Sequence, residues 1–246
     1  MAGGAPLPLG RFHELSLAAP DIRASVEFYE RLGFSQATTT DTFTHPYGVL
    51  TDGRLFLGLH RRAATPATLT FVRAGIADCL PAFASLGIEL SVCRTGEEVF
   101  NEIGFADPFG NPVTILEART YSPVARPDTE VSLCGDFAEV SLPAADFAAA
   151  QAFWEPLGFV AMGETEAPYP HLTLTSDHLD LAFHRPGTYD RPLVVFRALD
   201  MPERLARLAV LGVAGAGRLP RGVSGTGNTL IESPEGTALL LLADDG

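Results

Sequence analysis

The stretch FHELSLAAPDIRASVEFYERLGF, residues 12–34, returns without a gap as FAEVSLPAADFAAAQAFWEPLGF at residues 137–159. Both copies have a strand pattern, an aspartate where a helix cap is expected and a glycine where the helix should end. A repeat of this length predicts that each half of the chain solves the same packing problem. Most shared residues are of core or turn type. The exception is the glutamate at Glu14 and Glu139, because glutamate is usually rare within a strand.

The composition excludes several classes of function and partner. The chain has 246 residues, of which 46% are hydrophobic, and this is enough for one large core or two cores of ordinary size. All 17 basic residues are arginines, so the chain has no lysine for a Schiff base or a phosphate loop. The formal net charge of −13 has the wrong sign for gripping nucleic acid or an anionic membrane surface. We therefore expect neither nucleic acid nor a membrane as a partner.

The cysteines and the apolar runs indicate a cytoplasmic protein. The three cysteines show no CxxC spacing, and an odd number does not complete a disulfide framework. No apolar run in the sequence approaches the ~18 residues needed to span a bilayer. The first residues, MAGGAPLPLGRF, lack the basic and apolar regions of a secretory signal. A reducing cytoplasm is the expected location.

The order of the elements follows from the hydrophobic pattern of the repeat. In HELSLA, the alternation places Leu15 and Leu17 on one face of a strand and Glu14 on the other. The leucine face is expected to pack on the next helix, which is predicted to begin after Asp21 and to end at Gly33. Two further strands are predicted to follow as a hairpin. The second half repeats this order.

A finer repeat divides each half again, since the turn DPFG at residues 107–110 is matched by SPEG at residues 233–236. The chain is therefore predicted to be an α+β protein of four βαβββ units. One such unit leaves a sheet face open, so we expect the units to pair into two open, cup-shaped, barrel-like domains, each with a concave cavity. The predicted parts are a first domain at 10–120 with units at 12–62 and 67–118, a linker at 121–133, and a second domain at 134–246 with units at 137–186 and 190–243.

The strand HELSLAAPD, the helix SVEFYERLGF and the closing segment DPFGNPVTILE resemble the vicinal oxygen chelate superfamily. This superfamily includes glyoxalase I, fosfomycin-resistance proteins, extradiol dioxygenases and bleomycin-binding proteins. The resemblance extends over nearly the whole chain and implies a tandem member with two domains. Because the superfamily contains unrelated enzymes as well as non-enzymes, the function must be argued from the site.

The resemblance also implies where metal ligands would lie. In metal-dependent members, one ligand lies on the first strand of a unit, and another often follows the glycine of the closing turn by four residues. Alignment on the helix cap puts the first-strand position on Glu14 and Glu139 rather than on His13, which has the parity of the core leucines and is expected to point to the core or the strand edge. The closing positions hold Thr114 and Leu240, and the second unit begins without a histidine. These losses predict a degenerate metal centre and no cofactor.

An incomplete metal site is the alternative. The alternation in the later strands places His60, and His184 in the second half, on the same face as the glutamates. A carboxylate with a histidine is a sensible partial site for one divalent ion: zinc, iron, manganese or nickel. Two ligands alone would hold it weakly. The predicted sets are Glu14 with His60, and Glu139 with Asp180 and His184.

Each candidate residue also has a structural interpretation. The glutamates fit a solvated or arginine-paired position as well as a cavity wall, and the histidines fit the capping of loose strand-end carbonyls. Burial of Glu14 beside Phe56 would raise its pKa through desolvation and make it a proton acceptor. The triplets HPY at residues 45–47 and YPH at residues 169–171 fit either an aromatic wall that stacks a planar ligand or packing around a proline at a strand edge.

Two functions fit these residues. In the first, the metal centre is degenerate and the protein binds a small organic molecule in a concave cavity. In the second, it is a metal-dependent lyase, isomerase, dioxygenase or glyoxalase-like enzyme with a glutamate–histidine site, and Glu14 and Glu139 are its candidate catalytic residues, as metal ligands or directly as bases. The more apolar closing strand of the second half, residues 237–242, favours the first half as the functional one. Each half can complete its cavity alone, so both a monomer and a homodimer are feasible. The candidate ligand-binding residues are His45, Tyr47, Phe56, His60, Thr114, Tyr169, His171 and His184.

Overall fold

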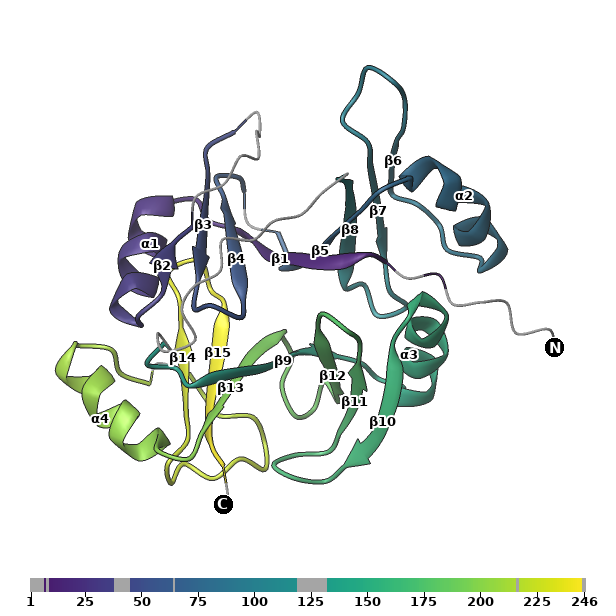
Figure 1. The fold of residues 1–246 in the computed structure, drawn as a ribbon. Helices are drawn as coiled ribbons and strands as arrows, with labels where there is room; N and C mark the ends of the chain where they lie inside the picture. The colour runs from purple at the N-terminus through teal and green to yellow at the C-terminus, as the bar shows by residue number, and fades with distance from the viewer. Residues whose placement is uncertain are drawn as a thin grey trace.

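The computed structural model describes residues 7, 9–37, 45–63, 65–118, 132–215 and 217–244. Within them the chain forms two mixed β-sheets, one from each half, with helices packed on the sheets (Figure 1). Neither sheet closes into a barrel. The predicted α+β class and the open domains are confirmed. The predicted linker at 121–133 lies outside the described residues, except for Ser132 and Leu133.

The first sheet has eight strands. Its strand β1 (Arg11–Ala18) runs parallel to β4 (Phe56–His60) and antiparallel to β5 (Thr68–Arg73), so the pairing of β1 with β5 joins the first unit to the second. The other elements are α1 (Ile22–Arg31), β2 (Ser35–Gln36), β3 (Tyr47–Thr51), α2 (Ile76–Ser85), β6 (Val92–Arg94), β7 (Glu102–Ala106) and β8 (Pro112–Glu117). The strand order is β2-β3-β4-β1-β5-β8-β7-β6.

The second sheet has seven strands and the same plan. Strand β9 (Asp136–Pro143) runs parallel to β12 (Asp180–His184) and antiparallel to β13 (Leu193–Ala198). The other elements are α3 (Phe147–Trp154), the short 3-10 helix η1 (Glu155–Leu157), β10 (Val160–Thr165), β11 (His171–Thr175), α4 (Met201–Val210), β14 (Thr229–Glu232) and β15 (Ala238–Ala243). The strand order is β10-β11-β12-β9-β13-β15-β14.

The fourth unit departs from the predicted βαβββ pattern, because only two strands follow its helix in the part of the chain that the structure describes. The described residues of the segment 211–228, LGVAGAGRLPRGVSGTGN, form a loop where the other units have a strand. Glycine and proline are both depleted in strands, and this segment is rich in glycine. The loop leaves β14 at the edge of the sheet.

The repeated helix signals act as the sequence predicts. The side chain of Asp21 accepts a hydrogen bond from the backbone N–H of Ala24 at 3.1 Å, and Asp146 accepts from Ala148 at 2.9 Å. Gly33 and Gly158 adopt left-handed conformations, with φ of 92° and 99°, just after the helical segments. These shared signals give both halves the same turn from strand to helix and back.

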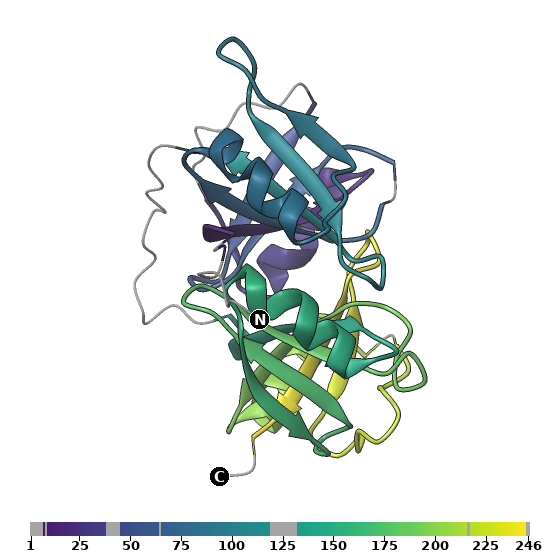
Figure 2. The ribbon, with the colours of Figure 1, turned by 90° about the vertical axis from the view of Figure 1, so that its right-hand side faces the viewer.

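The two halves pack together through one shared core. Figure 1 shows α1 beside β14 and β15, whereas α3 lies beneath the tips of β7 and β8, and Figure 2 shows the two sheets stacked one above the other. Phe34 contacts Phe196 of the second half with ring centroids 6.3 Å apart, and Phe105 contacts Phe153 at the same distance. The shared core contains the leucine face of β1, as predicted.

The sheet faces that point away from the shared core differ between the two halves. In the first sheet, this face carries the buried polar residues Glu14, Ser16 and Thr70. In the second, an apolar cluster fills the corresponding space. The buried members of this cluster are Tyr169, Leu193, Val195, Leu230, Ala238, Leu240 and Leu242.

The remaining sequence predictions concern membranes and cysteines. Among the described residues, no helix combines the length and the apolar character that a membrane span requires. All three cysteines are free, with Cys79 and Cys134 buried and Cys93 exposed. Burial raises the pKa of Cys134 to about 12, so its thiol is neutral at physiological pH.

Candidate functional site

The candidate site lies on the face of the first sheet opposite the leucine face of β1, where three neighbouring strands bring one polar residue each into a row. Glu14 of β1 pairs with Thr70 of β5, and Thr70 pairs with Thr114 of β8. Glu14 is 1% exposed and Thr70 is 3% exposed, whereas Thr114 is half-buried. Two of the three are the positions at which the family resemblance implied metal ligands. The row therefore holds one carboxylate and two hydroxyl groups.

The carboxylate of Glu14 is surrounded by hydrogen-bond donors. Ser16 donates to its Oε1 at 2.6 Å, and the hydroxyl of Tyr47 donates to its Oε2. Nε2 of His60 lies 3.0 Å from Oε1. Ser16 is in turn 2.7 Å from the hydroxyl of Thr70. A buried carboxylate with this many donors is held in its ionised form.

His60 extends this network toward the surface. Its Nδ1 lies 2.9 Å from Nε2 of His45, so a chain of hydrogen bonds runs from the buried Glu14 to the half-buried His45. The ring of Tyr47 packs on His60 with centroids 4.6 Å apart and an interplanar angle of 39°. The predicted pair of Glu14 with His60 is thus brought together, and the HPY triplet packs against it.

Gly58 makes the contact of Glu14 with His60 possible. It lies on β4 as the register partner of Ser16, two residues before the strand end at His60. A Cβ atom at this position would collide with the Glu14 carboxylate. The carboxylate therefore lies over a glycine and reaches the histidine two residues further along the same strand.

The pKa of Glu14 corrects one expectation from the sequence. Burial acts to raise this pKa, but the hydrogen bond from His60, the nearby charge of His13, and the hydroxyl donors Ser16 and Tyr47 act in the opposite direction. The result is a pKa below the ordinary value of 4.5. The predicted rise is wrong for Glu14, because the sequence pattern did not reveal how many donors converge on it. Glu14 is a fixed anion and not a proton acceptor at neutral pH.

The second half does not repeat this arrangement. Ala182 occupies the place of Gly58, and the side chain of His184 pairs with Ser141, whose hydroxyl lies 2.8 Å from Nδ1. No described residue forms a side-chain hydrogen bond with Glu139, which is 7% exposed. Burial raises the pKa of Glu139, with a further rise from Asp180 and an opposing effect of His171. Desolvation therefore has at Glu139 the effect that the sequence led us to expect at Glu14.

The predicted metal set of the second half is wrong in its geometry. Asp180 and His184 stand at opposite ends of β12, four residues apart, which is about 13 Å along a strand. One ion with ligand bonds of about 2 Å cannot reach both. Asp180 is exposed at the first position of β12, whereas His184 is completely buried at its last. Neighbouring Tyr169 and His171 are also buried, at 1% and 4% exposure, so they pack inside the protein and form no open aromatic wall.

A divalent metal does not fit either row of residues. In the first half the row of Glu14, Thr70 and Thr114 offers a single carboxylate, which is already bonded to hydroxyl and imidazole groups. In the second half, Glu139 pairs with Val195, and Val195 pairs with Leu240. Two aliphatic side chains supply no ligand. No group of three histidine, cysteine or acidic side chains able to hold an ion occurs among the described residues.

Three residues of the site were missed by the sequence argument. Ser16 shares the parity of Glu14 and recurs as Ser141, so the repeat itself carried this signal. Thr70 could be assigned only once the pairing of β1 with β5 was known. The alternation of residues along the strand predicts that His13 points to the core or the strand edge. In the structure, the register of β1 shifts between Phe12 and Glu14. Nε2 of His13 therefore lies 3.9 Å from Oε2 of Glu14.

Comparison with known proteins supports the fold. No protein-family profile and no curated protein matches the chain. Among solved structures, catechol 2,3-dioxygenase matches with a TM-score of 0.61 and 16% identity, over 97% of this chain and 89% of that chain. Homoprotocatechuate 2,3-dioxygenase from Arthrobacter globiformis matches with a TM-score of 0.66 and 17% identity, over 100% and 83% of the two chains. A variant of homoprotocatechuate 2,3-dioxygenase from Brevibacterium fuscum matches with a TM-score of 0.67 and 17% identity, over 100% of this chain and 74% of that chain.

Both names denote extradiol dioxygenases, which belong to the vicinal oxygen chelate superfamily. The chain therefore has the vicinal oxygen chelate fold in tandem form, as the resemblance implied. At 16–17% identity the likeness shows the fold alone.

Proposed function

We propose that the first half of the protein binds a small polar organic molecule on the face of its sheet that carries Glu14. The observation that carries this proposal is the chain of hydrogen bonds from Glu14 through His60 to His45. A buried ionised carboxylate is costly, and polar networks of this kind concentrate at functional sites. The second half, which has the same fold, has replaced this network with apolar packing.

The groups around the network define the kind of molecule. Tyr47, Phe56 and Thr114 are half-buried and lie on the same side of the sheet as Glu14. The aromatic rings offer apolar surface, and hydroxyl oxygens accept hydrogen bonds as well as donate them. A small ring compound with hydroxyl or amide groups matches this combination. The carboxylate of Glu14 fixes the directions of these donors and acceptors instead of binding a metal.

The dioxygenase activity named for the structural neighbours is not part of this proposal. The donor set of the first half has one carboxylate where the family resemblance implied several metal ligands. The measurement that tests this point is metal analysis of protein purified without added metal. Less than about 0.1 equivalent of any transition metal is expected. A stoichiometric ion that is lost in a Glu14→Gln variant would contradict it.

Binding is tested by thermal unfolding in the presence of a panel of hydroxylated aromatic acids, amides and lactones. At a hundredfold excess over its Kd, a ligand is expected to raise the Tm by about 5–10 °C. The rise should disappear in Glu14→Gln and persist in Glu139→Gln, which makes the same chemical change in the other half. A ligand whose effect survives Glu14→Gln but not Glu139→Gln would move the site to the second half.

A second candidate function is metal-independent proton transfer, as in an isomerase or lyase. It is favoured by one observation: His60 is held between a carboxylate and a second imidazole. Burial, together with His60 and Arg62, lowers the pKa of His45, so His45 is neutral at pH 7. A proton accepted by His45 can pass through the Nε2···Nδ1 hydrogen bond to His60, whose Nε2 lies 3.0 Å from the carboxylate of Glu14.

Proton transfer is tested by NMR, through deuterium exchange from solvent into the acidic C–H groups of α-hydroxyketones. The exchange rate should rise with pH to a plateau, and the midpoint of the rise should lie below the usual 6.5 of histidine, because the acceptor is neutral His45. His45→Asn should abolish the exchange and leave ligand binding in place. Equal rates in the wild type and His45→Asn would leave binding as the only function of this site.

A further inference from the structure

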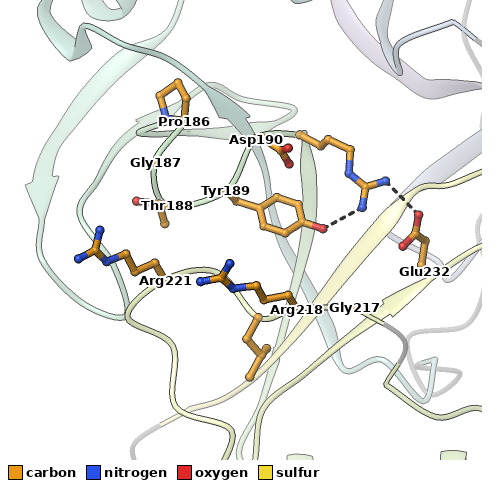
Figure 3. Close-up of a pocket in the computed structure, with 11 residues that line it drawn as sticks. Pro186, Gly187, Thr188, Tyr189, Asp190, Gly217, Arg218, Arg221 and Glu232 are labelled. Carbon is orange, nitrogen blue, oxygen red and sulfur yellow. Dashed lines mark hydrogen bonds and ion pairs between the residues drawn. The ribbon is translucent and has the colours of Figure 1, made fainter.

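A pocket of about 510 Å³ lies in the second half, away from Glu14, between two loops (Figure 3). One loop, residues 185–192, connects β12 to β13, and the other is part of the segment 211–228 that replaces a strand. The volume is in the range of sites that take small molecules. None of the residues predicted from the sequence lines it.

Three arginines line this pocket, although the chain has no lysine and a net charge of −13. Arg191 is anchored by Glu232 at 2.9 Å and by the hydroxyl of Tyr189 at 3.1 Å. Its guanidinium also lies 5.7 Å from the centre of the Tyr189 ring. Arg191 and Glu232 neutralise each other, so this pair forms a polar wall with no net charge.

The other two arginines, Arg218 and Arg221, carry the positive charge of the pocket. Neither forms an ion pair or a side-chain hydrogen bond with any residue that the structure describes. Both are exposed and line the same pocket, on the loop opposite the one that carries Thr188 and Tyr189 (Figure 3). The carboxylate of Asp190 also lines the pocket, so with Arg191 and Glu232 neutralising each other the lining keeps an excess of one positive charge.

The loop that carries these arginines is fixed in place. The backbone N–H of Arg221 donates to the carbonyl of Thr188 at 3.0 Å, which ties the two loops together. Leu219 lies between the arginines in the sequence and packs on the apolar cluster of the second half. Pro220 is buried, and the N–H of Val223 closes a turn onto its carbonyl at 3.1 Å. The arginines therefore extend from an ordered base, which lowers the entropic cost of binding.

We propose that this pocket binds the oxyanion, a carboxylate or a phosphate, of a small organic molecule between Arg218 and Arg221. The planar fork of a guanidinium group matches both oxyanions and binds them with two parallel hydrogen bonds. The hydroxyl of Thr188 lies at the same side of the pocket and adds a neutral donor. The remaining volume, beside Tyr189, accommodates the body of the molecule.

The site is separate from the one proposed for the first half and does not depend on it. The second half would thus have exchanged the polar network of the first for an apolar interior, and placed a binding site on its loops. An acidic surface of another protein is the competing occupant. A concave pocket of this volume favours a small molecule, because only a few side chains of another protein's surface could enter it.

The test is isothermal titration calorimetry of the full-length protein with phosphate, phenyl phosphate, benzoate and citrate, at an ionic strength held constant with sodium chloride. The double variant Arg218→Gln/Arg221→Gln removes both guanidinium groups. Its matched control is Arg23→Gln/Arg207→Gln, which removes the same charge from two exposed helical positions. Thermal unfolding of each variant confirms folding.

Saturable binding of one equivalent of at least one of these anions is expected, and it should weaken at least tenfold in the pocket variant and remain within twofold in the control. Preference for phenyl phosphate over benzoate assigns a phosphate ligand, and the reverse order assigns a carboxylate. The Glu14→Gln variant should bind the anion like the wild type, which separates this site from that of the first half. Equal binding by the pocket variant and the wild type, or no heat beyond that of chloride, would overturn the proposal.

Discussion

The carboxylate of Glu14 lies over Gly58 and occupies the space that the Cβ atom of any larger residue at position 58 would need. This relationship explains why the two halves differ although both keep the glutamate and the histidine. Ala182 takes the place of Gly58 in the second half, and there Glu139 does not reach His184. His184 pairs with Ser141 instead, and Glu139 forms no side-chain hydrogen bond with a residue that the structure describes.

The first prediction concerns Gly58→Ala. The new methyl group should push the Glu14 carboxylate away from His60 and break a charge-assisted hydrogen bond within the buried network. The free energy of unfolding should fall by about 1.5–3 kcal/mol, as measured by urea denaturation. The ring-nitrogen NMR signals of His60 should shift at the same time.

The matched control is Ala182→Gly, which removes the methyl group in the second half and should cost no more than about 1 kcal/mol. Unchanged His60 signals in Gly58→Ala would show that the glycine does not set the contact.

The second prediction compares Glu14→Gln with Glu139→Gln. The pKa of Glu14 is lowered, so its charge stabilises the folded protein above pH 4.5, and this contribution is lost as the pH falls through the folded-state pKa. The pKa of Glu139 is raised, so this residue costs stability as the pH rises above 4.5 through its folded-state pKa. At pH 7, Glu14→Gln should therefore lose about 1.5–3 kcal/mol.

The readout for this pair is the free energy of unfolding between about pH 3 and pH 8. The difference between the wild type and Glu14→Gln should grow in favour of the wild type as the pH rises to the unfolded-state value of 4.5, and should stay level above it. The difference between the wild type and Glu139→Gln should move the other way. Parallel curves for the two variants would mean that the two glutamates have equivalent surroundings, contrary to their contacts.

The sequence predicts the fold of this protein well because its signals are local and occur twice. The helix caps Asp21 and Asp146 and the stops Gly33 and Gly158 each act on the turn next to them, and both copies agree. The order of strands and helices then leaves few arrangements. In the segment 211–228, glycine and proline replace a strand, and this signal was also present in the sequence.

The site was less predictable because it depends on contacts between strands. The alternation of residues along the strands predicts Glu14 and His60 on one face of the sheet. The bulge that moves His13 toward Glu14 has no sequence signature. The pKa of Glu14 depends on the sum of several opposing effects, of which the strand pattern suggested only burial. The apolar residues opposite Glu139, Val195 and Leu240, become meaningful only in the register of β9, β13 and β15.

The third prediction concerns the acid sensitivity of the second half. His184 is fully buried, and desolvation lowers its pKa to about 4 from the usual 6.5. Between these values the unfolded chain binds a proton that the folded protein does not, so stability is lost as the pH falls from 6.5 to 4. The contribution of His184 to this loss should be about 3 kcal/mol. In His184→Asn, the urea unfolding curves at pH 7 and pH 4 should lie closer together by this amount, whereas His178→Asn, a change at an exposed histidine, should leave the wild-type dependence intact.

The fourth prediction concerns the contact between the halves. Glu235, in the closing turn of the second half, accepts hydrogen bonds from Ser25 and from Tyr29 of α1, each at 2.6 Å. Tyr29 is completely buried, and burial together with the charge of Glu235 holds its pKa well above 10. Glu235→Ala leaves two buried hydroxyl groups without their acceptor, and each such loss costs about 1–3 kcal/mol.

We therefore expect Glu235→Ala to lower the free energy of unfolding by about 2–4 kcal/mol. Glu164→Ala, at an exposed position of β10, should change it by less than about 0.5 kcal/mol. Removing the donors as well, in Ser25→Ala/Tyr29→Phe/Glu235→Ala, should recover part of the loss, because no buried hydroxyl group is then left without a partner. A triple variant less stable than the sum of the separate changes would show that the hydroxyl groups find other partners, and that the carboxylate does not hold α1 against the second half.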